Sequence, residues 1–229
     1  MDIQILPLTQ LDIPQAVECI QTVFVDDPYF LYLFNPSTYN RARNTASLSA
    51  HFLHGLGCNA PIYVAKYQNR VVGVCWWISP RPASSPPSLS ERVHDWILSF
   101  RQLLANIRYA GRGGLRVDRY LQWKELQAES QAETWSSPQG YYFCNVIAVR
   151  AETRGKGVGR KLVEAVTQRA DAEGVPCYLE SSKGVPNLLI YEKLGFELVS
   201  EIECVDGKDI CTMYGMIRSP KKRDGKYYD

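Results

Sequence analysis

The residues best suited to chemistry form a short run that alternates glycine with cationic side chains. In order, the run reads Arg154-Gly155-Lys156-Gly157-Val158-Gly159-Arg160. Glycine lets a backbone approach an anion closely, and the amides at the start of a helix are unpaired and carry partial positive charge. A turn of this kind before a helix binds phosphate. The run therefore predicts a site for a phosphorylated ligand, and its cations favour a diphosphate. The alternative is a flexible basic turn before an ordinary helix.

Spacing separates the possible diphosphates. A P-loop requires Ser or Thr directly after its lysine, whereas Gly157 follows Lys156 here. A dinucleotide fold places its glycines as Gly-x-Gly-x-x-Gly, with an acid at the end of a second strand about 20 residues further on. Glu173 or Glu180 could imitate that acid, but the sequence shows one such strand and helix unit only. A basic residue followed by x-x-Gly-x-Gly after an apolar strand is instead typical of N-acetyltransferases that use acetyl-CoA.

Two blocks of sequence carry a resemblance to a known family. The first is the pattern Arg154-x-x-Gly157-x-Gly159. The second runs from residue 180 to 196 and ends in Tyr191-Glu192-Lys193-Leu194-Gly195-Phe196. In these blocks, which lie within residues 141–200, the chain resembles the GNAT superfamily of acetyltransferases. Segments 24–28, 179–182 and 211–213 are most similar to the puromycin N-acetyltransferase group, whereas residues 80–140 match that group poorly.

The resemblance implies both a fold and a co-substrate. The implied fold is of the α/β (α+β) class: a mixed, mostly antiparallel central sheet of about six or seven strands, flanked by helices. Its two central strands part in a V-shaped splay. The implied co-substrate is acetyl-CoA, with no metal. Backbone groups of the central strand would bond the pantetheine arm and the thioester carbonyl; these belong to Ile147, Ala148 and Val149.

The resemblance also implies a reaction, in which an amine attacks the thioester directly within a ternary complex. Tyr191 matches the tyrosine that acts as general acid for the leaving thiolate, and Asn187 matches the residue that bonds the pantetheine arm. Glu180 is our candidate general base, because it ends the strand that faces the splayed one. The alternative for Glu180 is a solvated carboxylate at a strand end. The acceptor is expected to be a small-molecule amine. The alternatives are a protein or peptide amine, or a domain that binds acyl-CoA without turnover.

Other polar clusters have simpler explanations. Asp26 and Asp27 could bind a cationic substrate, but a capped helix end before Pro28 is the preferred interpretation. His51 and His54 are close to metal-ligand spacing, yet no third ligand accompanies them, so we expect no metal site. The five tryptophans could line an aromatic pocket, although core packing is the favoured role for most of them.

Hydrophobic periodicity predicts the elements that must position these residues. Strands are predicted at 2–8, 61–67, 71–78, 141–149, 177–181, 196–204 and 209–218. Helices are predicted at 9–24, 38–56, 91–108, 118–133, 157–173 and 187–194. Asp26-Asp27-Pro28 should break the first helix, and residues 79–90, rich in Pro and Ser, should form a loop.

Composition and charge bound the class of protein. The 229 residues are 45% hydrophobic and 22% charged with a net charge of +2, which is ordinary for a globular chain and too mild to argue for nucleic acid. No apolar run reaches the ~18 residues of a membrane span, and the N-terminus lacks the layout of a signal peptide. We therefore expect a cytoplasmic protein with no membrane partner. The seven cysteines suggest reduced, buried thiols rather than disulfides.

Domain organisation follows from the same patterns. We expect one acetyltransferase domain over residues 1–218 and a charged C-terminal tail over 219–229. Within the domain, residues 80–140 are expected to form a helical insertion on the substrate side, like a lid over a small pocket. The protein is expected to be a monomer or a homodimer.

Overall fold

Within residues 2–82 and 84–221, one seven-stranded sheet forms the centre of the fold. The computed structural model describes residues 2–82 and 84–221. The strands lie in the order β1-β2-β3-β4-β5-β7-β6, and every neighbouring pair is antiparallel except β4 and β5. Their bounds are β1 Gln4–Pro7, β2 Ile62–Tyr67, β3 Arg70–Ile78, β4 Tyr142–Val149, β5 Cys177–Ser181, β6 Glu197–Asp206 and β7 Asp209–Arg218. The expected mixed, mostly antiparallel sheet is confirmed.

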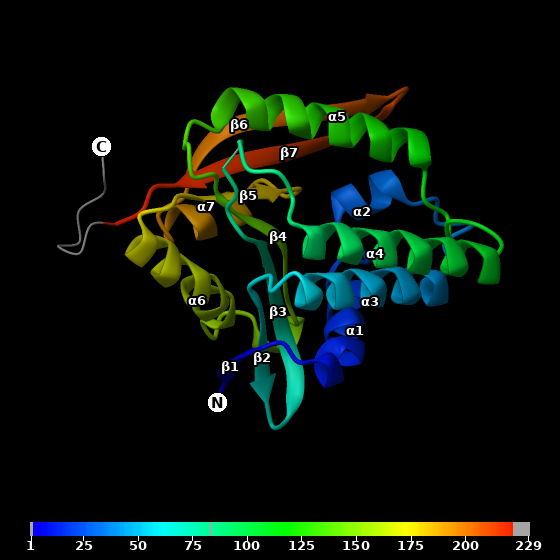
Figure 1. Ribbon diagram of the computed structural model, residues 1–229, viewed down its shortest axis with the longest axis horizontal. Helices are drawn as coiled ribbons and strands as arrows, with labels where there is room; N and C mark the ends of the chain where they lie inside the picture. Colours follow the sequence, from blue (N-terminus) through cyan, green and yellow to red (C-terminus); the bar gives the residue numbers. More distant parts are fainter. Residues whose placement is uncertain (1, 83, 222–229) are drawn as a thin grey trace.

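Helices cover both faces of the sheet (Figure 1). On one face lie α6 and α7. On the other lie α1, α2, α3 and α5, while α4 packs against the outside of α3. The helices span α1 Ile13–Val23, α2 Pro28–Leu33, α3 Arg41–Gly57, α4 Leu89–Arg108, α5 Val117–Thr134, α6 Val158–Glu173 and α7 Asn187–Glu192, with 3-10 turns at Gln10–Asp12 and Ala151–Thr153.

Local sequence explains where these elements begin and end. Thr9 and Asp12 form a capping box at the start of the first helical segment, as the sequence predicts. Gln68 and Asn69 adopt positive φ angles of 49° and 61° in the turn between β2 and β3, a geometry that suits the twist of a tight hairpin. Gly174 ends α6 in the left-handed conformation, with φ of 68°.

The apolar core is divided into three clusters. One lies between α6 and the sheet and includes the fully buried Trp77 and Leu162. A second lies under α1 and α3, around Phe52 and Val74. The third lies under α2 and α5, around Trp123. The last two share one face of the sheet. They cover different halves of it, one on β2 to β4 and the other on β6 and β7.

The parting of β4 and β5 is the feature of the sheet that matters most for function. The two strands pair over three positions, from Tyr142↔Cys177 to Cys144↔Leu179, although β4 continues to Val149 and β5 to Ser181. The register of β4 against β3 shifts at the same place, where Trp77 faces Cys144 and Trp76 faces Val146. Asn145 is thus an extra, bulged residue. A bulge bends and twists its strand, and here it accounts for the V-shaped splay.

The structure corrects several element boundaries. Residues 28–33 form α2, which the sequence analysis missed because six residues are too few for a periodic signal. The strand β6 extends to Asp206, so its turn is shorter than predicted, whereas β7 spans Asp209–Arg218 as predicted. The third helix begins at Arg41 rather than residue 38, capped by the Asn40 side chain. Of the predicted charged tail, residues 222–229 lie outside the described residues.

Candidate active site

The glycine turn lies between the end of β4 and the start of α6, as predicted. Gly155 and Gly157 have φ angles of 74° and 75°, which L side chains rarely adopt, so glycine is needed at both positions. A Cβ added at either would find nothing within 4 Å. The turn therefore faces open space, and its backbone is free to approach an anion.

Packing fixes this turn firmly in place. Val158, the first residue of α6, is buried, and a Cβ added at Gly73 of β3 would lie 3.2 Å from its Cγ1. Before the turn, the Arg150 amide donates to the Val72 carbonyl at 2.9 Å. The Arg150 guanidinium donates to the Val71 carbonyl at 3.1 Å. Sequence reasoning missed Arg150 because its role is a backbone contact that no motif marks. The amides of the first helical turn are thus held in a fixed, exposed position suited to phosphate.

The cations around the turn differ in how free they are. The ammonium of Lys156 donates to the Glu152 carbonyl at 2.8 Å, and Arg160 lies 3.9 Å from Glu164. Within residues 2–82 and 84–221, the side chain of Arg154 has no partner. Arg154, Lys156 and Arg160 are all exposed. The Arg154 guanidinium is therefore the cation most available to a phosphate oxygen.

The outer half of β4 connects the turn to the splay. Ile147, Ala148 and Val149 pair with β3 along one edge, while their other edge lies beyond the last pairing with β5. A Cβ at Gly159 would lie 3.8 Å from Cγ2 of Val149, so the first turn of α6 sits directly over the strand end. Backbone donors and acceptors on an unpaired strand edge can bond an extended ligand, as in strand addition.

The short helix α7 brings Tyr191 towards the splay from the face covered by α6. Tyr191 packs against the core cluster under α6, with its ring centre 6.2 Å from that of Phe196. Burial raises the pKa of its phenol, and nearby Cys144 and Cys75 raise it further. Among the described residues the hydroxyl has no hydrogen-bond partner, yet it is not fully buried. A protonated phenol without a hydrogen-bond partner is suited to proton donation.

Asn187 is the first residue of α7 and is half-buried. Its side-chain amide also has no hydrogen-bond partner within the described part of the chain.

Glu180 lies on β5 on the opposite face of the sheet, beneath α5. Its carboxylate accepts hydrogen bonds from Gln127, from Tyr178 at 3.0 Å and from Gln131 at 3.3 Å. Burial raises the pKa of Glu180 above the ordinary glutamate value, and these donors partly offset the rise. Lys124 in turn donates to the oxygen of Gln127, which orients its amide nitrogen towards Glu180. Sequence reasoning missed the two glutamines because α5 lies in the stretch that matched no motif.

Asp27 ties the segment before α2 to the end of β5. Its carboxylate accepts from the Tyr29 amide at 3.0 Å, capping α2, and from the Ser182 hydroxyl at 2.7 Å. Asp26 lies 3.4 Å from Lys183. Asp27 thus caps the start of α2, a helix that the sequence analysis missed, rather than the end of the helix before it. Tyr29 then contacts Trp123 of α5 edge-on, with ring centres 5.4 Å apart. These contacts close the side of the splay that faces Glu180.

Other candidates lie away from this site. His54 is 2.8 Å from Asp95, and burial lowers the pKa of His51 to about 4. Among the described residues no group of three or more potential ligands gathers to hold a metal. Of the tryptophans, Trp76, Trp77 and Trp123 are buried in the core, whereas Trp96 is 79% exposed.

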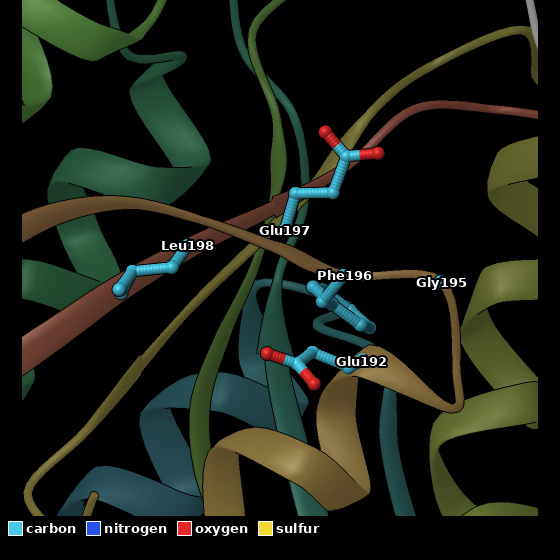
Figure 2. Close-up of a pocket in the computed structure, with 5 residues that line it drawn as sticks. All are labelled: Glu192, Gly195, Phe196, Glu197 and Leu198. Atoms are coloured by element: carbon cyan, nitrogen blue, oxygen red, sulfur yellow. The ribbon is translucent and has the colours of Figure 1, made fainter.

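One hollow on the surface is a poor candidate for the coenzyme. It lies where α7 leads into β6 (Figure 2), has a volume of about 470 Å³, and is lined by Glu192, Gly195, Phe196, Glu197 and Leu198. Its charged side chains are carboxylates, which repel a diphosphate. The splay and the glycine turn, rather than this hollow, define the candidate active site.

Comparison with known proteins agrees with this geometry. Residues 131–198 match the family model described as an acetyltransferase (GNAT) domain. An uncharacterised N-acetyltransferase of Schizosaccharomyces pombe is 24% identical over 217 residues, covering 92% of this chain and 81% of the yeast protein. In the described part of the chain, no helix is both long enough and apolar enough to cross a bilayer.

Two solved structures share the fold. One, from Corynebacterium glutamicum, is described as histone acetyltransferase HPA2 and related acetyltransferase; it is 20% identical, with a TM-score of 0.58, and the match covers 96% of this chain and 97% of that one. The other is a polyamine N-acetyltransferase of Drosophila melanogaster that catalyses the formation of N-acetylagmatine; it is 16% identical, with a TM-score of 0.58, over 95% of this chain and all of that one. Residues 131–198 thus resemble a GNAT acetyltransferase domain, and the chain shares the fold of these solved acetyltransferases.

Proposed function

We propose that the protein transfers an acetyl group from acetyl-CoA to the amine of a small molecule, by direct attack within a ternary complex. The observation that carries this proposal is the splay itself. An unpaired strand edge, Ile147–Val149, runs from the glycine turn towards a gap with an unengaged phenol on one face and a carboxylate of raised pKa on the other.

Each residue then has a role that follows from its place. The turn from Arg154 to Arg160 would hold the pyrophosphate, and Asn187 and the free edge of β4 would hold the pantetheine arm. Acetyl-CoA supplies the thioester when bound. Backbone amides near Val149 would donate to the thioester carbonyl as charge develops on its oxygen.

The proton movements use the two faces of the sheet separately. Glu180 would take the proton of the attacking amine, directly or through a water molecule. As the carbon–sulfur bond breaks, Tyr191 would donate its proton to the departing thiolate. Attack and departure then occur on opposite sides of the carbonyl carbon, with a proton acceptor on one side and a donor on the other.

The acceptor side favours a small amine over a peptide. Tyr29, Trp123 and the bond from Asp27 to Ser182 close the site from α2 and α5, where a peptide would need an open groove. The resemblance to the puromycin N-acetyltransferase group makes aminonucleosides the first acceptors to test. In this proposal residues 1–218 form a single domain, and residues 80–140 lie on its substrate side. Within that segment, α5 is the part that reaches Glu180.

The deciding experiment is an acetylation screen. Purified protein and acetyl-CoA are combined with polyamines, aminonucleosides, aromatic amines and short peptides. Thiol release is followed, and products are identified by mass. We expect acetylation of one or more small amines with little transfer to peptides. Preferred transfer to peptides would assign a protein acceptor, and tight coenzyme binding without thiol release from any amine would indicate a non-catalytic domain.

A further inference from the structure

The helix α4 is amphipathic, but its polar side faces the rest of the fold and its apolar side faces outward. Its inward side meets α3 through polar contacts. The Arg43 guanidinium donates to Asn106 at 2.6 Å and to Gln102 at 3.2 Å, and His54 lies 2.8 Å from Asp95. Helices normally bury their apolar stripe and expose the polar one. Because these polar contacts fix the rotation of α4 about its axis, its apolar side must face outward.

That outward side is a continuous apolar stripe. At 3.6 residues per turn, eight large apolar residues fall within an arc of roughly 120°, and no polar residue of the helix falls inside it. Trp96 is 79% exposed and Phe100 60%. The stripe consists of Leu89, Val93, Trp96, Ile97, Phe100, Leu103, Leu104 and Ile107. It extends over the whole helix, about 30 Å, and contiguous exposed apolar surface of this kind marks an interaction site.

The charges beside the stripe identify the chemistry of its partner. Arg92, Arg101 and Arg108 flank it on both sides and are exposed. From residue 28 to residue 116 the only acids in the sequence are Glu91 and Asp95. Both turn inward and are already paired, Glu91 with Arg81 and Asp95 with His54. The outward half of α4 is thus apolar along its centre and cationic along its edges.

We infer that α4 docks the protein onto the surface of an anionic phospholipid membrane. A helix with Trp, Phe and Leu on one side and flanking arginines lies in the plane of the lipid interface, with its apolar side buried in the headgroup boundary. A helix of this kind rests on the bilayer without crossing it, so the lack of a spanning helix in the described residues does not bear on it. The sequence analysis predicted no membrane partner, because the periodicity of a helix does not show which of its sides faces outward.

A second copy of the chain fits the same stripe less well. A two-fold interface places identical edges against each other, so arginine would meet arginine with no acid nearby to neutralise it. The stripe also stands on one convex helix. Two surface hollows lie elsewhere, one where α7 leads into β6 and the other around Asp2 and Asn69. A convex, cationic-edged ridge suits a soft, flat, anionic surface better than a protein groove.

Vesicle flotation tests the inference. The full chain is mixed with vesicles of phosphatidylcholine alone or of phosphatidylcholine with phosphatidylserine. We expect binding to the anionic vesicles and, because each arginine near the surface strengthens binding, an affinity roughly 100-fold lower for the neutral ones. Phe100→Glu should abolish binding without changing thermal unfolding, because the side chain is exposed. Leu121→Glu on α5 is a matched control, because the Leu121 side chain is 58% exposed and lies outside the stripe; this variant should bind like the wild type.

Other outcomes would overturn the inference. These are no flotation of the wild-type protein, equal binding to both kinds of vesicle, or undiminished binding of Phe100→Glu. Light scattering provides a second measurement. If the wild-type protein proves to be a dimer that Phe100→Glu dissociates, and neither binds vesicles, the stripe is an interface between two copies of the chain.

Discussion

The two candidate catalytic side chains differ in what surrounds them, and this difference separates their roles. The Tyr191 hydroxyl has no partner among the described residues, whereas three donors surround the Glu180 carboxylate. A raised pKa keeps a phenol protonated and ready to donate. It also makes a carboxylate a stronger base than an ordinary glutamate. These environments support the proposed roles of Tyr191 as acid and Glu180 as base, which residue type alone does not distinguish.

Tyr191→Phe tests the acid. We expect kcat to fall by roughly 10²-fold with little change in coenzyme affinity, because the ring remains packed against Phe196 while the proton is lost. Steady-state kinetics and calorimetry measure the two quantities. An acetyl donor with a more acidic thiol needs less help in leaving and should recover much of the rate. Equal losses with both donors would remove the acid role from Tyr191.

Glu180→Gln tests the base through the pH dependence of kcat/KM. Glu180 must be ionised to act, so kcat/KM should rise with pH through its pKa, which lies above the ordinary 4.5. The variant should lose roughly 10²-fold in rate together with this acidic limb. If instead the variant kept the limb, another group would be the base.

The same variant should also alter stability in a defined direction. Folding raises the pKa of Glu180, so the folded chain holds this proton more tightly than the unfolded chain. The contribution of the group to stability is then fully present below the ordinary pKa and is lost as pH rises through the raised value. Glu180→Gln removes the buried charge and should be at least as stable as the wild type at pH 7 in thermal unfolding.

Sequence motifs predicted the positions of site residues better than they predicted which distant residues contact them. The sequence predicted the turn that holds Gly157 and the short helix that holds Asn187 and Tyr191, because both are local structures, whereas the roles of Asn187 and Tyr191 came from the family resemblance. The surroundings of Glu180 did not, since Gln127 and Gln131 come from a helix about fifty residues earlier in the chain. Contacts between distant segments depend on tertiary packing, which periodicity does not encode.

At the scale of elements, α6 offers an internal comparison between its two ends. Gly157 precedes the helix with φ of 75°, and Gly174 follows it with φ of 68°. A Cβ at either position would find nothing within 4 Å. A side chain therefore introduces the same left-handed strain at both ends, at about 1 kcal/mol or more, without a steric clash at either. Only the N-terminal end presents unpaired amides to an anion.

Gly157→Glu and Gly174→Glu use this comparison as a prediction. We expect both to lower the unfolding midpoint by similar amounts, and only Gly157→Glu to lose coenzyme binding, by roughly 100-fold or more, because its carboxylate meets the pyrophosphate. Calorimetric titration with coenzyme A measures the binding. Similar losses in both variants, or normal affinity in a folded Gly157→Glu protein, would move the site away from this turn.

The sequence predicted that the strands exist, but it did not predict how they pair with one another. Apolar runs predicted all seven strands, because alternation and β-branched residues are local signals. The bulge at Asn145 and the early end of the β4–β5 pairing left no such signal. They arise from how strands meet across the sheet. The splay therefore entered the sequence analysis through family resemblance alone, and the register of the strands shows its physical cause.

At the scale of the whole molecule, the sheet consists of two halves joined weakly. Three register pairs connect β1–β4 to β5–β7, and α6 and α7 pack across the same face. The cluster under α6 spans both halves, whereas each of the other two clusters lies on one half only. A ligand that bonds β4, α6 and α7 at once would supply contacts that the sheet itself lacks at the splay. Coenzyme binding should therefore stabilise the region between the halves more than either half alone.

Hydrogen exchange can detect this bridging. With coenzyme A at 100 times its Kd, we expect the global stability to rise by about 2.7 kcal/mol, since only the folded state binds. Beyond this general increase, protection should rise most at residues 145–149 and at 187–192, which border the splay. The hairpin of β6 and β7, distant from the turn, serves as the internal reference. Because Gly157→Glu lacks the phosphate contact, its exchange should be unchanged by coenzyme A. A uniform rise in protection over the whole wild-type chain would mean that the coenzyme binds elsewhere than between β4 and β5.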